Sequence, residues 1–114
     1  MIGSQCSGAL LLARLGLLAD MPACTDLTTE PWLVEAGVRV EEAPFHARGP
    51  IATAGGCLAS QYMAAWMMAR GAGFDAAAQA LHCAAPVGEK QAYVARLLDG
   101  VRPFIAPGAS APRK

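Results

Sequence analysis

The sequence predicts an α/β fold, in which short strands alternate with helices along a chain of 114 residues. A turn of small residues at 4–8 leads directly into an apolar helical run at 9–13. Residues 51–54 form a short β-prone run that ends at a double glycine, and residues 58–70 carry apolar side chains at helical spacing. A chain of this length forms at most one ordinary domain, and no repeat or linker divides it.

The first predicted elements are a strand end at residues 1–2 and a helix over 7–18. Because only two residues represent that strand, the sequence indicates a chain that begins within a domain. The helix is apolar on nearly every face, which predicts that it is buried. A turn at 20–22 and a short parallel strand at 23–25 follow.

The middle of the chain predicts a helix followed by a β-hairpin. In order, we expect a helix capped by Thr28 or Thr29 and ended by Gly37, a strand at 38–41 continued at 45–47, a turn at 48–50 and a return strand at 51–54. Pro31 falls in the first turn of the helix, where its missing N–H needs no intrahelical partner. The strand segments alternate apolar and polar residues, as half-exposed strands do.

The last part of the chain predicts three helices, at 58–70, at 76–83 with Asp75 as its cap, and beyond Gly88. One face of the final helix carries Tyr93, Val94, Leu97 and Leu98. Methionine and aromatic residues in the first of these helices could line a cofactor site, but such stripes ordinarily pack in a core, and we interpret them so. Residues 106–114, rich in Ala, Pro, Gly and Ser, are expected to be a disordered tail.

The composition of the chain bears on which binding partners are expected. Nine basic and nine acidic residues give a formal net charge of zero, so neither nucleic acid nor an anionic membrane surface is an expected partner. Hydrophobic residues make up 54% and charged residues 16%, below the usual quarter or so for charged residues. This excess predicts elements buried on several faces, or a surface that associates with a second copy in a homo-oligomer or with a missing part of the domain.

Four cysteines are spread along the chain: Cys6, Cys24, Cys57 and Cys83. They form no C-x-x-C pair and have no histidines at ligand spacing, so we expect no metal and no cofactor. An even number permits two disulfides, and residues 9–18 followed by Cys24 could be a lipoprotein-like signal. No basic residue precedes that run, however, and Arg14 interrupts it. We therefore expect a reduced, cytoplasmic protein.

The segment Ser4-Gln5-Cys6-Ser7-Gly8 is the main candidate for chemistry. A cysteine among small residues, between a strand and a helix, is typical of a nucleophile elbow, which exposes the sulfur at a strained turn. The start of the helix supplies partial positive charge and unpaired N–H groups that can hold an oxyanion. The alternative is that Cys6 is an ordinary packing cysteine, as many free cysteines are.

Three segments together suggest a family: CSGALLLA at 6–13, IATAGG at 51–56 and APVGEK at 85–90. With them the sequence resembles the DJ-1/PfpI family, whose domain has the class I glutamine amidotransferase-like fold. The resemblance spans residues 2–105 and covers only the second half of such a domain. It implies that residues 1–105 are the C-terminal part of a flavodoxin-like three-layer sandwich whose N-terminal half is absent.

The resemblance also implies roles for three residues. Cys6 would be the nucleophile, and the N–H of Ser7 would be one oxyanion donor. Many members have a histidine where this chain has Ser7, and others have one after the next strand, where this chain has Asp26. Asp26 is therefore the acidic candidate in this chain. The family's own acidic partner of the cysteine and its second oxyanion amide belong to the absent half.

Two other features are interpreted as structural. Gly55-Gly56 could cradle a phosphate, but no P-loop lysine or G-x-G-x-x-G pattern accompanies it, so we expect the glycines to allow close approach of backbone segments. His46 is expected on an edge strand or exposed, and His82 is expected to be a packed helix residue.

The missing histidine bears on the activity, because an amidase needs efficient proton transfer to its leaving amine. The resemblance extends to the isonitrile hydratase branch, which uses a similar C-S/T-G-A-L-L-L-A segment without that histidine. It implies a cysteine-dependent hydratase or hydrolase acting on a small molecule, with the fragment alone expected to be inactive. The alternatives are a ligand-sensing domain of an AraC-type transcriptional regulator, and a redox or stress-response protein in which Cys6 is oxidised to sulfenic acid.

Overall fold

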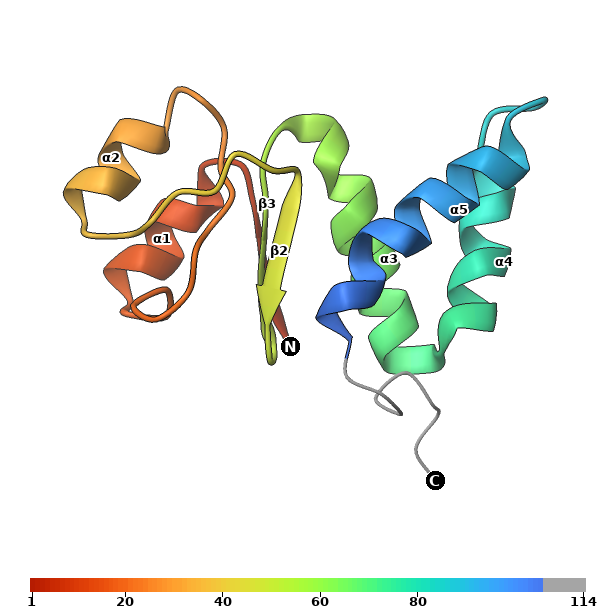
Figure 1. Cartoon of the computed structure of the whole chain (residues 1–114), viewed down its shortest axis with the longest axis horizontal. Coiled ribbons are helices and arrows are strands. Elements are labelled where there is room, and N and C mark those ends of the chain that lie inside the picture. The colour runs from red at the N-terminus through yellow and green to blue at the C-terminus, as the bar shows by residue number, and fades with distance from the viewer. Residues whose placement is uncertain (106–114) are drawn as a thin grey trace. The chain divides into compact units, whose positions relative to one another are not determined.

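Strands and helices alternate along the first part of the chain, and helices alone follow (Figure 1). The computed structural model describes residues 1–105. The elements are β1 (Ile2–Gln5), α1 (Gly8–Arg14), α2 (Glu30–Glu35), β2 (Phe45–Arg48), β3 (Ile51–Ala54), the 3₁₀ turn η1 (Cys57–Ala59), α3 (Ser60–Ala72), α4 (Phe74–Ala84), α5 (Lys90–Val101) and η2 (Arg102–Phe104). The predicted α/β class is confirmed. The chain divides into two units, residues 1–63 and residues from 64 onward.

A three-stranded mixed sheet in the order β1-β3-β2 organises the first unit. β1 pairs in parallel with β3, with Gln5 opposite Ala54, and β2 pairs antiparallel to β3. A tight turn that contains Gly49, at φ +57°, joins β2 to β3, so the predicted hairpin is confirmed. The parallel pairing places the carboxyl ends of β1 and β3 side by side, at the edge where Cys6 and Gly55 follow them.

The core of the first unit lies between the sheet and the helices α1 and α2, which Figure 1 shows on the same side of the sheet. Its buried residues are Ala9, Leu12, Leu18, Met21, Ala23, Leu33 and Val38. Ile51 of β3 packs against this cluster and ties it to the sheet. The apolar helical run after the elbow therefore contributes one side of a real core.

Helix α1 is shorter and less covered than predicted. The sequence predicts a helix over 7–18, but α1 ends at Arg14, and the chain then turns through Gly16 at φ +79°. Leu11 and Leu15, four residues apart on the outer face, are each 63% exposed. The prediction of a helix buried all round is therefore wrong, because the elements of the first unit cover only one face of α1.

The strands predicted at 23–25 and 38–41 reduce to one parallel bridge between Ala23 and Val40. Ala23 makes both hydrogen bonds of this bridge: its N–H donates to the carbonyl oxygen of Arg39, and its carbonyl oxygen accepts from the N–H of Glu41, each at 2.9 Å. The N–H of Cys24 points to the opposite edge of the segment and donates to Oγ1 of Thr53 on β3 at 2.8 Å. The two predicted strands are therefore confirmed only at this one residue pair, and the rest of both segments is loop.

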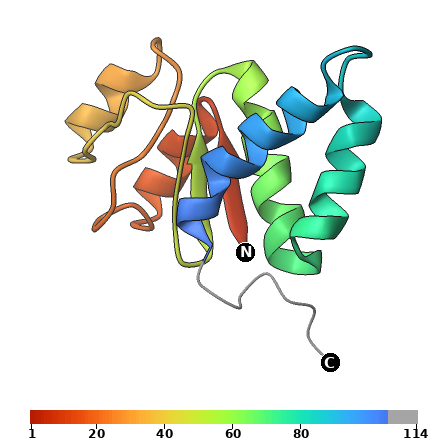
Figure 2. The ribbon, with the colours of Figure 1, turned by 45° about the vertical axis from the view of Figure 1, so that its right-hand side comes forward.

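The three helices predicted for the last part of the chain are confirmed as α3, α4 and α5, with α3 and α4 joined at Gly73 (Figure 2). The buried side chains on these helices include Trp66, Ala69, Ala77, Leu81, Leu97, Leu98 and Val101. Trp66 is completely buried, which confirms that its stripe is a packing surface. Two local predictions are wrong: Gly73, not Asp75, is the cap residue of α4, and His82 is exposed.

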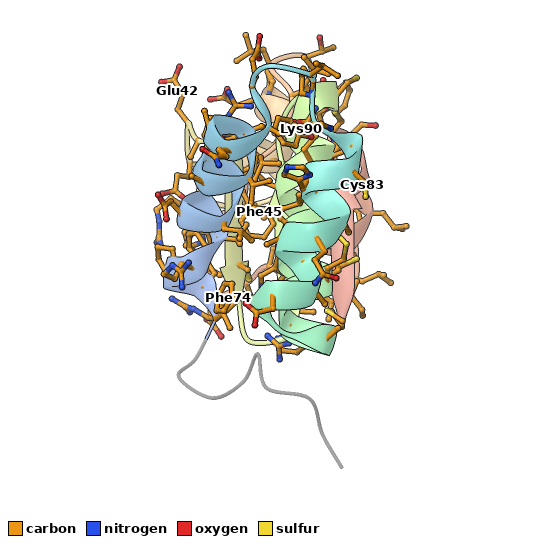
Figure 3. The ribbon with its side chains drawn as sticks, turned by 90° about the vertical axis from the view of Figure 1, so that its right-hand side faces the viewer. Glu42, Phe45, Phe74, Cys83 and Lys90 are labelled. Atoms are coloured by element: carbon orange, nitrogen blue, oxygen red, sulfur yellow. The ribbon has the colours of Figure 1, made fainter. Side chains whose placement is uncertain are left out.

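Hydrogen bonds and a cation–π contact are made at the two ends of α4 in the second unit. Nζ of Lys90, at the start of α5, donates to the carbonyl oxygens of His82 at 2.7 Å and Ala85 at 2.9 Å, at the end of α4 (Figure 3). The guanidinium of Arg102 lies 4.4 Å from the ring centroid of Phe74 at the other end of α4. Within residues 1–105 no helix is both long enough and apolar enough to cross a bilayer. The predicted tail at 106–114 lies outside the described residues.

Candidate functional site

The site begins at the turn that follows β1. Cys6 has φ +53°, and it is the only non-glycine residue with a positive φ within 1–105. Residues other than glycine avoid this left-handed backbone conformation, which costs them on the order of 1 kcal/mol or more. β1 reaches Gln5, beyond the two residues predicted, and Ser7 caps α1. The predicted passage from strand through a strained turn to a helix is confirmed.

Hydrogen bonds hold the backbone of Cys6 from both sides. Its N–H donates to the carbonyl oxygen of Ala54 at 2.8 Å, which extends the β1–β3 pairing by one bond. Its carbonyl oxygen accepts from Oγ1 of Thr25 at 2.8 Å and from the N–H of Ala9 at 3.2 Å. The strained turn is therefore fixed by the adjacent strand, by the loop after Cys24 and by the first turn of α1.

Cys6 is a partly exposed residue with a free thiol. Nε2 of Gln5 lies 3.2 Å from Sγ and donates to it. The same nitrogen also donates to the carbonyl oxygen of Gly56. Gln5 thus joins the sulfur to the double-glycine segment after β3, a contact that the sequence did not predict.

Ser7, the predicted oxyanion donor, is the N-cap residue of α1, and its side chain makes no capping hydrogen bond. Within residues 1–105 its backbone N–H donates to no acceptor, whereas the N–H groups of Ala9 and Leu10 bond back to the turn. The N–H of Ser7 is therefore available to a negative oxygen beside the turn.

The carboxylate of Asp26 accepts the N–H of Thr29, the cap residue of α2, at 3.2 Å. Hydrogen bonding from Thr29 lowers the pKa of Asp26 below its usual 3.8, so the group is ionised at neutral pH. The hydroxyl of Thr25 has one proton, and its shorter contact is to Cys6 rather than to Asp26 at 3.4 Å. Within the described residues no hydrogen bond joins Asp26 to Cys6.

The other cysteines differ sharply in their surroundings. Cys24 is fully buried, and burial together with the nearby charge of Glu41 raises the pKa of its thiol to about 11. Cys24 is therefore a thiol, not a nucleophilic thiolate, near neutral pH. Cys57 and Cys83 are exposed. Within residues 1–105 no group of three or more His, Cys, Asp or Glu side chains could hold a metal ion.

The double glycine permits a close backbone contact. A Cβ atom on Gly55 would lie 2.6 Å from the carbonyl oxygen of Thr25, too close for any other residue without displacing the backbone. Gly56 has φ +94°, which also favours glycine. The predicted close approach is confirmed, and the segment it meets is the loop that carries Thr25.

A pocket of about 370 Å³ lies next to this contact, lined by residues 25–27, Glu30, 40–44 and 55–56. Its carboxylates come from Asp26, Glu30, Glu41 and Glu42. Cys6 and Ser7 are not among its lining residues. The sequence did not predict this pocket, because its acidic residues belong to two loops and to the first turn of α2, which only the fold brings together.

His46 lies on the edge strand β2, as predicted, with Nδ1 2.9 Å from Oε1 of Glu41. Its neighbour is therefore an acidic group of the pocket loop. Of the predicted site residues, the structure brings Cys6 and Ser7 together and gives Asp26 a capping role. Gln5 and Thr25 are the contacts to Cys6 that sequence reasoning missed, and neither residue type carries a distinctive spacing signal.

No protein-family model matches the chain. A comparison with curated proteins likewise finds no match.

Proposed function

We propose that the chain is a cysteine-dependent hydratase or hydrolase for a small electrophile, with Cys6 as the nucleophile. The proposal places residues 1–105 in the DJ-1/PfpI family, as the C-terminal part of a flavodoxin-like, class I glutamine amidotransferase-like sandwich. One observation carries it. Cys6 alone among the described non-glycine residues adopts a left-handed φ, and this partly exposed residue lies at a strand-to-helix turn.

An isonitrile illustrates the chemistry. The sulfur of Cys6 forms a bond to the terminal carbon of the substrate, and the thiol proton moves to that carbon, which gives a thioimidate. Water then adds to the same carbon, the carbon–sulfur bond breaks, and an N-formyl amide leaves as the thiol is restored. The N–H of Ser7 would donate to negative charge that develops on the incoming oxygen.

Asp26 has a supporting role in this proposal. A general acid must hold a proton at the working pH, but hydrogen bonding keeps the pKa of Asp26 low. Its carboxylate instead fixes the start of α2 and the loop that carries Thr25. Thr25 in turn holds the carbonyl group of Cys6 at 2.8 Å.

Covalent labelling tests the proposal, because bond formation at sulfur requires only the nucleophile. The purified chain is incubated with a small activated ester or an aliphatic isonitrile, and each cysteine is followed by peptide mass spectrometry. We expect labelling of Cys6 ahead of Cys57 and Cys83.

Two substitutions serve as a matched pair for this experiment. Cys6→Ala should abolish labelling at this site, whereas Cys83→Ala should leave the labelling of Cys6 unchanged. Equal losses from the two variants, with equal losses of thermal stability, would indicate folding damage and contradict the proposal. Labelling of Cys6 no faster than that of Cys83 would contradict it as well.

A redox role is the second candidate, and the partial exposure of Cys6 as a free cysteine favours it. The thiolate of Cys6 would attack one oxygen of a hydroperoxide, giving sulfenic acid on the protein and releasing water or an alcohol. Trapping of sulfenic acid with dimedone after peroxide treatment tests this role. Faster trapping at Cys6 than at Cys57 supports it, and equal trapping contradicts it.

A further inference from the structure

We infer that Gln5 is the positioning residue of the Cys6 sulfur, holding it against the double-glycine segment through a two-donor side-chain amide. The inference rests on the proposed function, since it takes Cys6 as the nucleophile. Nε2 of Gln5 donates to Sγ of Cys6 at 3.2 Å and also to the carbonyl oxygen of Gly56. A primary amide nitrogen carries two hydrogens, so one serves each acceptor.

Contact between these neighbouring side chains depends on the unusual backbone of Cys6. Consecutive side chains along an extended strand point to opposite faces, and Gln5 is the last residue of β1. The left-handed φ of +53° at Cys6 breaks this alternation. The strained turn thus brings the sulfur of Cys6 within hydrogen-bonding distance of the Gln5 amide.

The orientation of the Gln5 amide follows from its two neighbours. Turning the amide over would place Oε1 against the Gly56 carbonyl oxygen, and two acceptors repel each other. In the observed orientation Oε1 is buried and has no hydrogen-bond partner among the described residues. Buried acceptors are ordinarily paired, so the contacts of Nε2 with Gly56 and with Cys6 must outweigh this loss.

The contact has an electrostatic consequence for the sulfur. A hydrogen bond to a charged acceptor is stronger than one to a neutral acceptor, and a thiolate accepts more strongly than a thiol. Gln5 therefore stabilises the nucleophilic form of Cys6. Gly56 anchors the amide, so the segment after β3 determines where this donor lies.

The test compares alkylation of Cys6 by iodoacetamide, measured site by site with mass spectrometry between about pH 6 and pH 10, in the wild type and in Gln5 variants. Gln5→Leu removes both donors at similar size, and we expect about a tenfold loss of rate at neutral pH, the usual effect of one such hydrogen bond. Gln5→Glu replaces the donors with carboxylate oxygens and should slow the reaction further. In both variants the midpoint of the pH profile should move to higher pH.

Two controls keep the experiment specific. Gln91→Glu makes the same chemical change at an exposed position of α5 and should leave the profile of Cys6 unchanged. Cys83, which is exposed on α4, is the internal reference in every sample. Thermal unfolding verifies that each variant is folded, and Gln5→Met replaces Gln5→Leu if the leucine variant does not fold.

The outcomes separate this inference from the proposed function. A Gln5→Leu profile that superimposes on the wild type would overturn the inference and leave Cys6 as nucleophile. A slower reaction with an unchanged midpoint would also overturn it, because that pattern indicates steric blocking. Alkylation of wild-type Cys6 no faster than that of Cys83 would contradict the proposed function itself.

Discussion

The two units of the chain differ in how completely they cover their apolar side chains. Large hydrophobic residues that are more than a third exposed lie almost entirely in the first unit: Met1, Ile2, Leu11, Leu15, Leu17, Leu27, Trp32, Val34 and Leu58. Among residues 64–105 only Val87 belongs to this class. Among the described residues, the second unit therefore exposes far fewer large hydrophobic side chains than the first unit does.

The same contrast holds for the backbone. The first unit contains the left-handed Cys6 and the close contact of Gly55 with Thr25. In the second unit Gly71 lies within α3 with open space where a Cβ atom would be. Left-handed glycines occur in both units, for example Gly16 and Gly73, so the contrast rests on the left-handed Cys6 and on the close contact of Gly55.

The largest expected effect comes from a pair of glycine substitutions, one in each unit. Gly55→Ala forces a Cβ atom to 2.6 Å from the Thr25 carbonyl oxygen and should destabilise the fold by about 3 kcal/mol. Gly71→Ala should stabilise it by about 0.5 kcal/mol, because alanine favours the helix and nothing obstructs it. Urea denaturation of both variants measures the two free energies of unfolding. Equal effects of the two substitutions would remove the contrast between the units.

The second prediction concerns the outer face of α1. We expect the chain to self-associate through its exposed apolar surface, and Leu11→Glu combined with Leu15→Glu should lower the association constant by about tenfold or more. Val87→Glu changes one isolated exposed side chain and should have little effect. Sedimentation velocity over a range of concentrations measures the association. A wild-type chain that stays monomeric would contradict the expected self-association through this surface.

The smallest expected effect lies at the start of α2. Asp26→Ala removes the acceptor of the Thr29 N–H and should cost about 1 kcal/mol at neutral pH. Asp26→Asn retains an acceptor oxygen and should cost less. Denaturation of both variants and of the wild type at neutral pH measures these differences.

The pH dependence of this effect has a definite sign. The folded pKa of Asp26 is lowered, so its contribution is complete above the ordinary pKa of 3.8 and is lost as the pH falls through the folded pKa. The advantage of the wild type over Asp26→Asn should therefore shrink below about pH 4. An advantage that does not change with pH would show that the charge of Asp26 does not stabilise the fold.

Local patterns in the sequence were sufficient for much of the fold. Apolar spacing predicts α3, α4 and α5, and the turn between two β-prone runs predicts the hairpin of β2 and β3. The small residues around Cys6 predict the strand-to-helix turn. A tight turn requires small residues at a few consecutive positions, and such a requirement is visible in the sequence. These features depend on residues that are close in the chain, and a single sequence displays them directly.

Tertiary structure decided the features that depend on distant segments. Residues 23–25 have the composition of a strand, but they pair with the segment at 38–41 only through the bridge between Ala23 and Val40. Leu11 lies on an apolar helix, yet its exposure depends on how much of α1 the other elements cover. The contact between Gln5 and Gly56 joins residues 51 positions apart. No local pattern specifies such a pair, because the parallel pairing of β1 with β3 creates it.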